Sequence, residues 1–329
     1  MNPRISIITP SFNQGIFLEE TIRSVLDQNY PDLEYIIIDG GSTDDSVSII
    51  KKYSDRLAYW VSEKDSGQSE AINKGLRRAS GSIIAWLCSD DVYEPGTFSR
   101  VADFFNTHPE TALVHSLSRL FGPQQKELIV GGNIRDIPLR YHAMMPFPQP
   151  SSFFRKLVLD SQGYLDESLH FAMDFDLLQR IALNYPVSHT NETWSNYRIH
   201  ANSKTQNEMD GFAREWAFVF SRFVRSVNGS GPAIEVLQKA GLYHDGTSTY
   251  KHQHEFSEAD IKKILSIFLH NQLALCYERL DRPKAMQILA ILEKYNPVYY
   301  RENKIGSLGL KLQWLPSSVI KMLRLYTRR

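Results

Sequence analysis

Cysteine, net charge and long apolar runs are all scarce in this sequence, and each scarcity excludes a class of protein. Two cysteines, Cys88 and Cys276, occur among 329 residues, which is too few for a disulfide framework. No apolar run reaches the roughly 20 residues that span a bilayer. The stretch Met1–Thr9 enters a strand-like pattern without the apolar core of a signal peptide. We therefore expect a cytoplasmic protein in a reducing compartment.

The charges of the chain balance, with 37 Lys and Arg against 37 Asp and Glu. This balance argues against nucleic-acid binding through a broad basic surface and against an acidic disordered chain. Hydrophobic residues make up 42% of the chain, enough for a sizeable core. At roughly 100–200 residues per domain, the length favours about two domains. We expect a globular protein with no nucleic acid among its partners.

The first hundred residues alternate strand-like and helix-like segments. This order predicts a mainly parallel sheet with helices on both faces. Ligands bind such sheets at the carboxyl ends of the strands. Cys88 lies in the last predicted strand and is expected to be buried. The predicted strands are 5–8, 33–39, 57–62 and 82–88. Helices are predicted at 15–28 and 68–78, and between them a helix is predicted to begin near the capping residues Thr43 to Asp45 and to run to Tyr53.

Adjacent acids follow the fourth predicted strand in the sequence Ser89-Asp90-Asp91. Two carboxylates this close are costly unless a cation or a hydrogen-bonding ligand lies beside them. Hard oxygen ligands suit Mg²⁺ or Mn²⁺, which proteins commonly share with substrate phosphates. The alternative is a solvated turn that caps the next helix, because Asp is common in turns. These residues alone leave both interpretations open.

Five sequence blocks occur in order along the first part of the chain: ISIITPSFN (5–13), ETIRSVLDQ (20–28), IDGGSTD (38–44), DSGQSEAINKG (65–75) and SDD (89–91). Together they resemble glycosyltransferase family 2. The resemblance covers roughly residues 4–205 and is strongest up to residue 100. It implies the GT-A fold, a Rossmann-like mixed, mainly parallel sheet with helices on both faces. It also implies an inverting enzyme that depends on a nucleotide sugar.

The resemblance implies that Thr9, Pro10 and Ser11 line the nucleotide pocket and that Asp39 accepts a hydrogen bond from the nucleobase. An ionised carboxylate only accepts hydrogen bonds, and uracil presents an imide N–H, so uridine diphosphate is the expected nucleotide. The alternative for Asp39 is a turn-forming acid before two glycines.

The stretch that begins at Asp65 resembles the third of the family's sequence blocks that face the nucleotide. By that resemblance Asp65, Gln68 and Asn73 belong to the nucleotide site, and Lys74 is a partner for the diphosphate. Lys74 also follows Glu70 by four residues, which is the spacing of an ordinary pair on a helix surface.

At the family's metal motif, the resemblance places Asp90 on the ribose hydroxyls or behind the metal, and makes Asp91 a ligand of Mn²⁺ or Mg²⁺. Ser89 stands where many members carry a third acid. The segment Tyr197–Ser203 resembles one that closes over the diphosphate in many relatives. His200 would there be a third metal ligand or a phosphate donor, while Arg198 alternatively anchors the loop.

An inverting transfer needs a base on the acceptor hydroxyl. The family places this carboxylate at the start of a helix beyond the acceptor loop, which makes Asp174 the predicted base. Met173 departs from the Glu that many relatives carry there. Asp176 points roughly the other way along the helix and is expected to cap it or to pair with Arg180.

The expected function is therefore metal-assisted sugar transfer from a nucleoside-diphosphate donor to a surface glycan or a lipid-linked oligosaccharide. A sugar-nucleotide pyrophosphorylase would need a glycine-rich basic loop near the first strand, and residues 9–15 contain one glycine and no Lys or Arg. The other alternative is an inactive nucleotide-sugar-binding scaffold. The presence of both Asp91 and Asp174 argues against it, because binding alone needs no base.

The chain is expected to divide into a catalytic domain at 1–210 and a helical region at 211–329. The catalytic domain would comprise a nucleotide-binding half at 1–100 and an acceptor half at 101–210. Residues 301–329 carry a net charge of +6, which leaves −6 for the first 300 residues. Between 316 and 329, apolar and basic residues fall on opposite helical faces. This tail is expected either to lie peripherally on an anionic membrane or to pack on the domain.

Overall fold

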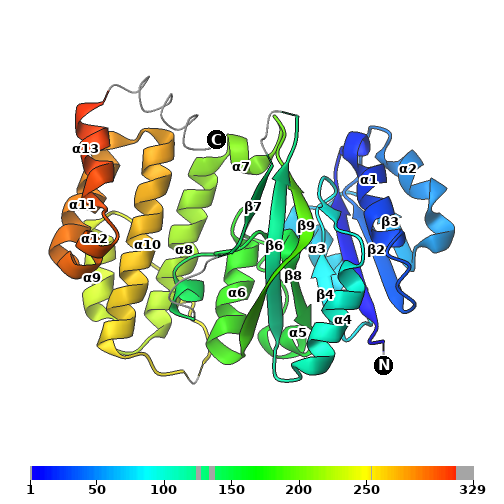
Figure 1. The fold of residues 1–329 in the computed structure, drawn as a ribbon, viewed down its shortest axis with the longest axis horizontal. Helices are drawn as coiled ribbons and strands as arrows, with labels where there is room; N and C mark the ends of the chain where they lie inside the picture. The colour runs from blue at the N-terminus through cyan, green and yellow to red at the C-terminus, as the bar shows by residue number, and fades with distance from the viewer. Residues whose placement is uncertain (1, 124–126, 133–137, 253, 316–329) are drawn as a thin grey trace. The chain divides into compact units, whose positions relative to one another are not determined.

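The computed structural model describes residues 2–123, 127–132, 138–252 and 254–315 (Figure 1). The chain forms two compact units. The first comprises Met1–Ile134 with Pro146–Ser203, and the second comprises Arg135–Met145 with Lys204–Arg329. Within the described residues, every strand belongs to the first unit.

One mixed sheet forms the centre of the first unit (Figure 1). Its strands are β1 (Ile5–Ser11), β2 (Leu33–Asp39), β3 (Tyr59–Ser62), β4 (Ile83–Trp86), β5 (Val92–Tyr93), β6 (Leu113–Phe121), β7 (Leu128–Val130), β8 (Ser152–Arg155) and β9 (Val187–Arg198). The strand order is β3-β2-β1-β4-β8-β6-β9-β5, and β7 pairs with β6. The first four strands in this order are parallel, and β8 then runs antiparallel to both β4 and β6. This topology confirms the predicted α/β class with a mixed sheet.

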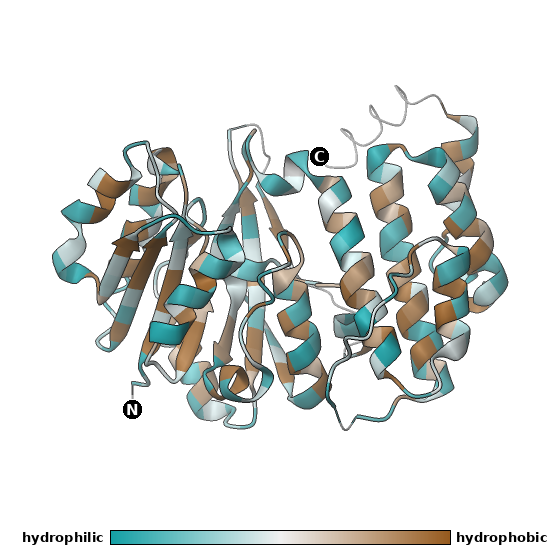
Figure 2. Cartoon of the chain, turned by 180° about the vertical axis from the view of Figure 1, so that it is seen from behind, coloured by the Kyte–Doolittle hydropathy of each residue, from teal (hydrophilic) through white to brown (hydrophobic). Residues whose placement is uncertain are grey.

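Helices cover both faces of the sheet. The helices of the first unit are α1 (Gly15–Leu26), α2 (Ser46–Lys52), α3 (Gln68–Arg78), α4 (Thr97–Thr107), α5 (Leu157–Gln162) and α6 (Met173–Asn184). Leu18 and Ile22 of α1 pack with Ile5 and Ile7 of β1 in the main buried cluster. Ile8 points to the other face, where a Cβ added to Gly75 of α3 would lie 2.4 Å from its Cγ2 atom. Hydrophobic residues accordingly follow the strands (Figure 2).

The helix expected to begin near Thr43 to Asp45 is α2, which begins at Ser46 with Asp45 as its N-cap residue. The three preceding residues form a loop that is held by hydrogen bonds to the start of α1. Thr43 donates its backbone N–H to Asn13 Oδ1, and Asp44 Oδ2 accepts from the N–H of Gly15. These partners are about 30 residues away in sequence, so the local pattern of capping residues did not reveal them.

The second unit is helical. Its helices are α7 (Lys204–Asn207), α8 (Met209–Ser226), α9 (Gly231–Lys239), α10 (Glu258–Arg279), α11 (Arg282–Tyr295), α12 (Pro297–Glu302) and α13 (Gly306–Trp314). Phe220 of α8 and Phe268 of α10 are both buried and stack with ring centroids 3.8 Å apart, so these two helices share a core. Helix α10 packs against α11, and Ser257 and Asp260 cap α10 reciprocally. Among the described helices, none is both long and apolar enough to cross a membrane.

Candidate functional site

The loops that carry the predicted site residues meet at the carboxyl ends of β1 to β4. The register pairs Ser11 with Asp39 and Asp39 with Ser62, so these strands end side by side. Gly40 N donates to Ser11 O at 2.8 Å. A Cβ on Gly40 would lie 2.7 Å from Asp65 Oδ2, so only glycine lets the loop after β3 approach this closely. The fold therefore gathers segments that are far apart in sequence into one site.

The end of β1 places one unsatisfied polar group in this site. Thr9 is buried, and its hydroxyl lies 3.0 Å from the Tyr35 hydroxyl. Pro10 is buried in the same strand. Ser11 Oγ is buried and has no hydrogen-bond partner among the described residues. An unpaired buried hydroxyl costs about 1–3 kcal/mol, so Ser11 is suited to meet a polar group of a ligand.

Asp39 is fully buried at the end of β2 and already binds several donors. Its Oδ2 atom accepts from the N–H groups of Gly41 and Ser42 and from the Ser62 hydroxyl, at 3.1, 2.9 and 2.7 Å. Its Oδ1 atom accepts from the Ser42 hydroxyl at 2.6 Å. The carboxylate thus fastens the turn after β2, and Oδ1 accepts fewer of these hydrogen bonds than Oδ2 does.

Asp65 and Gln68, from the predicted nucleotide-site block 65–75, lie close to the strand ends. Asp65 Oδ1 accepts from the N–H of Gly67 at 3.0 Å. Burial raises the pKa of Asp65 above its usual value, against the opposing effect of that hydrogen bond. Gln68, the first residue of α3, donates from Nε2 to Cys88 Sγ at 3.1 Å.

Asn73 and Lys74 are held by other parts of the unit. The buried Asn73 exchanges hydrogen bonds with the backbone of Leu165, both at 3.0 Å, and so ties α3 to the segment that precedes α6. Lys74 Nζ lies 2.9 Å from Glu63 and 3.0 Å from Glu70, so the helix-surface pair expected from the sequence is present.

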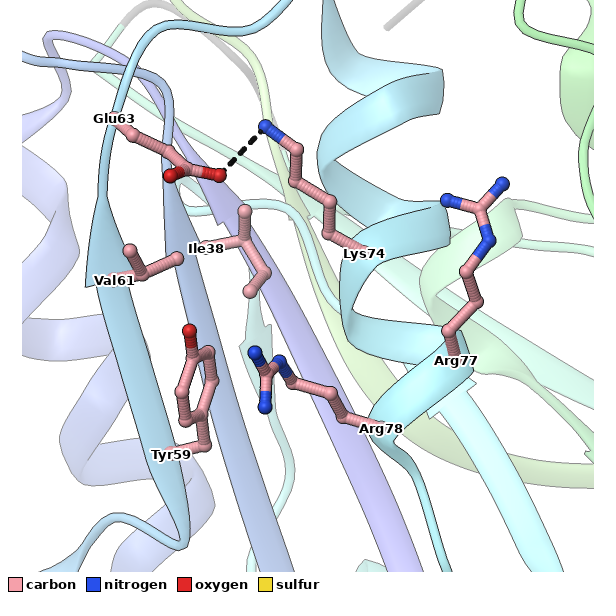
Figure 3. A pocket seen from close by; sticks show the side chains of 7 residues that line it. All are labelled: Ile38, Tyr59, Val61, Glu63, Lys74, Arg77 and Arg78. Atoms are coloured by element: carbon pink, nitrogen blue, oxygen red, sulfur yellow. Dashed lines mark ion pairs between the residues drawn. The ribbon is translucent and has the colours of Figure 1, made fainter.

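Lys74 also lines a pocket of about 340 Å³ between α3 and the edge strand β3 (Figure 3). The floor of this pocket is apolar and comprises Ile38, Tyr59 and Val61. The guanidinium of Arg78 lies 3.7 Å from the centre of the Tyr59 ring. Lys74 is therefore ion-paired with both Glu63 and Glu70 beside the edge strand β3.

The acidic pair after β4 has the electrostatics of a cation site. Asp91 is 1% exposed, and burial together with the charge of Asp90 raises its pKa well above the usual range. Thr21 donates its hydroxyl to the carbonyls of Ser89 and Asp91, which fixes the turn against α1. One ligand atom from each of Cys88, Asp90 and Asp91 lies within 4.8 Å of the other two. This set of oxygen and sulfur atoms fits a divalent cation.

Residues at the end of β9 and just beyond it contact the acidic pair. Arg198 donates its backbone N–H to Asp91 Oδ1 at 2.9 Å and its Nε–H to the carbonyl of Asp90 at 2.8 Å. His200 Nε2 lies 3.0 Å from Asp90 Oδ2. The aromatic ring of Phe17 packs against the side chains of Arg198 and His200. The structure therefore brings His200 and Arg198 to the predicted metal motif, with His200 directly on Asp90.

The predicted base, Asp174, lies half-buried in the first turn of α6. The segment that leads into α6 packs on the start of α3, where Ser69 donates its hydroxyl to the carbonyl of Leu169 at 2.7 Å. Asp176 is 1% exposed and pairs with Arg180 at 2.9 Å, as expected from the sequence. Asp174 Oδ1 accepts from the N–H of Phe175 at 2.7 Å, so the two acids of this turn have different partners.

Two site residues were missed by the sequence analysis. Cys88 was expected to be buried in a strand, but β4 ends at Trp86 and Cys88 lies half-buried in the acidic turn. The direct adjacency of Cys88 to Ser89-Asp90-Asp91 was the available signal. Phe17 had no such signal, because its contact with His200 joins residues from the two ends of the first unit.

Comparison with known proteins adds four findings. Residues 6–163 match the family model described as Glycosyl transferase family 2. An uncharacterized glycosyltransferase of Mycobacterium tuberculosis is 31% identical over 188 residues, which are 55% of this chain and 70% of the relative. A GalNAc(5)-diNAcBac-PP-undecaprenol beta-1,3-glucosyltransferase of Campylobacter jejuni is 30% identical over 172 residues, or 50% of this chain and 56% of the relative. The crystal structure of S. aureus TarS 1–349 in complex with UDP-GlcNAc shares the fold, with a TM-score of 0.60 and 17% identity over 89% of this chain and 81% of that chain.

Proposed function

Because the chain belongs to glycosyl transferase family 2 and is therefore a glycosyltransferase, we propose that it transfers a sugar from a UDP-sugar to a hydroxyl with inversion. The observation that carries this proposal is the buried carboxylate of Asp91 beside Asp90 at the carboxyl end of a parallel strand. A site of this kind suits the diphosphate of a nucleotide sugar together with a cation.

Asp91 would hold Mn²⁺ or Mg²⁺, with Asp90 and His200 beside it. The bound ion would neutralise charge on the leaving diphosphate, which replaces a general acid. Arg198 orients Asp91 through its backbone N–H, and His200 orients Asp90 through its imidazole. The Phe17 ring packs against His200 and Arg198 and so supports the two residues that orient the acids.

The nucleotide would bind across the ends of β1, β2 and β3. Thr9, Pro10 and Ser11 would line the pocket, with Asp39 as the acceptor for the nucleobase N–H. Asp65, Gln68 and Lys74 would complete the donor site, Asn73 would hold α3 in place beneath it through its hydrogen bonds with Leu165, and Asp90 would contact the ribose. The support is the unsatisfied hydroxyl of Ser11 and the UDP-GlcNAc complex of TarS, which has the same fold.

Asp174 would take the proton of the acceptor hydroxyl. Its support is a position in the first turn of α6, where Asp176 has a separate partner in Arg180. The proposed acceptor is a glycan or a lipid-linked oligosaccharide. The Campylobacter jejuni relative, whose printed name specifies an undecaprenol-linked acceptor, supports this class.

A donor screen tests the proposal. Purified protein with Mn²⁺ and a panel of nucleotide sugars is expected to release UDP when lipid-linked glycans are added. Mass analysis of the product would then identify the sugar and the acceptor. If no donor releases its diphosphate with any acceptor, the inactive nucleotide-sugar-binding scaffold becomes the better hypothesis.

Selectivity for uracil is expected to depend on Asp39. The Asp39→Asn variant replaces one acceptor oxygen with a donor, so UDP affinity should fall about 10-fold while the weaker GDP affinity stays unchanged. Calorimetry with both nucleotides measures this difference. The Ser62→Ala variant is the matched control, because it removes one donor to Asp39 and leaves the carboxylate in place. Equal affinities of the wild type for UDP and GDP would contradict this role.

Helix α13 supports the proposed association with the inner, anionic face of a membrane. Leu310 and Trp314 lie one helical turn apart and are 61% and 72% exposed. The basic residues Arg301, Lys304 and Lys311 lie in the same stretch of chain and are also exposed. An exposed Trp beside basic residues is typical of helices that lie at a lipid interface. The amphipathic tail predicted at 316–329 lies outside the described residues.

Replacing both apolar side chains is expected to weaken membrane binding. Leu310→Ser combined with Trp314→Ser should lower affinity for phosphatidylglycerol vesicles at least 10-fold, because burying each side chain contributes about 1.5–3 kcal/mol. Co-sedimentation measures the binding, and Val298→Ser is a control because Val298 is also exposed, on α12. Equal sedimentation of the double variant and the control would contradict this membrane contact.

A further inference from the structure

We propose that Cys88 is a third protein ligand beside Asp90 and Asp91, so that this site binds thiophilic divalent cations more tightly than oxygen ligands alone would. The inference rests on the proposed function, because it concerns the cation of that same site. It assigns a role to a half-buried thiol that the transfer reaction as proposed above leaves unused.

The backbone turns Cys88 towards the acids. Asp91 donates its N–H to the carbonyl of Cys88 at 3.1 Å, which closes a four-residue turn directly after β4. The ligand atoms of Cys88, Asp90 and Asp91 all lie within 4.8 Å of one another. Ligands at about 2.0–2.3 Å from one ion are themselves about 3–4.5 Å apart, so a small adjustment of side chains completes the set.

The turn is supported from three sides. Thr21 of α1 donates to the carbonyls of Ser89 and Asp91 at 2.9 and 2.8 Å. The backbone N–H of Arg198 binds Asp91. Gln68 Nε2 approaches the sulfur of Cys88 to 3.1 Å and fixes its direction. Residues that orient ligands in this way raise the affinity of a metal site.

The chemistry of the three ligand atoms determines which cations bind more tightly when the sulfur is a ligand. Two carboxylates suit Mg²⁺ and Mn²⁺, whereas a thiolate favours softer ions such as Zn²⁺ and Cd²⁺. Affinity already rises from Mn²⁺ to Zn²⁺ at most sites, so the order of ions in the wild type is not diagnostic by itself. The diagnostic quantity is the change in each affinity when the sulfur is removed.

Binding of Cd²⁺ and Mg²⁺ to the full chain in the presence of UDP tests the proposal. In Cys88→Ser, we expect Cd²⁺ affinity to fall at least about 10-fold and Mg²⁺ affinity to stay within about twofold of the wild type. The sulfur-to-Cd²⁺ charge-transfer band in the ultraviolet should be present in the wild type and absent in Cys88→Ser. The matched control is Cys276→Ser, which removes the chain's other thiol and should keep the band.

Alkylation of the unsubstituted protein gives a second measurement that does not depend on how a variant folds. Iodoacetamide should modify Cys88 faster than Cys276, which is 1% exposed and whose thiol pKa is raised by burial. Cd²⁺ should slow the modification of Cys88, and Mg²⁺ should not. Peptide mapping by mass spectrometry separates the two sites.

Two outcomes would overturn the proposal and differ in meaning. If Cys88→Ser binds Cd²⁺ as tightly as the wild type, and Cd²⁺ leaves alkylation of Cys88 unchanged, the sulfur is not a ligand but the proposed function stands. If neither Mn²⁺ nor Cd²⁺ binds the wild type with UDP present, both the sulfur ligand and the proposed metal site fail.

Discussion

The Asp91→Asn variant should lose metal-dependent UDP binding, and transfer should fall by about 10³-fold. Asp91 supplies the buried negative charge that would meet the cation, and its neighbour Asp90 is more exposed. Asparagine keeps the shape of the side chain and an oxygen that can accept from Arg198 N–H. The substitution therefore removes charge while it preserves the contacts of the turn. Calorimetry of UDP with and without Mn²⁺ measures the first effect, and release of UDP measures the second.

The same substitution should not destabilise the metal-free protein. Burial and the charge of Asp90 raise the pKa of Asp91, which means that ionising this side chain costs more in the folded protein than in the unfolded chain. Asparagine carries no charge, so the melting temperature of the metal-free variant should equal or exceed that of the wild type. Added Mn²⁺ with UDP should then stabilise the wild type alone.

Glu34→Gln is the matched control at the opposite end of the sheet. Glu34 accepts from Ser6 and Ser80, and these hydrogen bonds, against the opposing effect of burial, hold its pKa below the usual value. Removing this charge should lower the melting temperature and leave metal-dependent UDP binding intact. If Asp91→Asn instead destabilises the metal-free protein and binds UDP with Mn²⁺ as the wild type does, Asp91 is a structural residue.

The sequence revealed the sheet and the strand ends because both depend on local patterns. Runs rich in β-branched residues mark β1, β2 and β4, and their ends carry the short polar loops. Parallel pairing then brings Ser11, Asp39 and Ser62 together without further information. The position of Asp174 near the start of a helix was also predicted, from the resemblance to glycosyltransferase family 2, and α6 begins at Met173.

The hydrogen-bond partners of each site residue depend on contacts between distant parts of the chain, which the local sequence does not encode. Asn73 was expected at the nucleotide, but its amide binds Leu165, which lies 92 residues away. Asp39 was weighed as a nucleobase acceptor or a turn former, and the donors around it come from both its own loop and the end of β3. Such long-range pairs decide which polar groups remain available for a ligand.

The Asp174→Asn variant is expected to lower the rate of transfer by about 10²–10⁴-fold. The carboxylate would accept the proton of the acceptor hydroxyl, and an amide cannot do so near neutral pH. Because Asp174 lies on α6 and the proposed nucleotide contacts lie at the ends of β1 to β3, UDP affinity should stay within about twofold of the wild type. Single-turnover transfer and UDP calorimetry separate the two quantities. A large loss of UDP affinity would show that Asp174 serves the donor instead.

Asp176→Asn distinguishes a base from a structural acid on the same helix. Asp176 and Arg180 are 1% and 12% exposed at the side chain, and Arg180 also donates to the carbonyl of Tyr164. Breaking such a buried pair costs about 3–5 kcal/mol, so this variant should melt at a lower temperature. Below that temperature its folded fraction should retain transfer activity, whereas folded Asp174→Asn should not. If instead Asp176→Asn removes transfer from a stable protein and Asp174→Asn does not, Asp176 is the base, since the two acids differ by only two positions on α6.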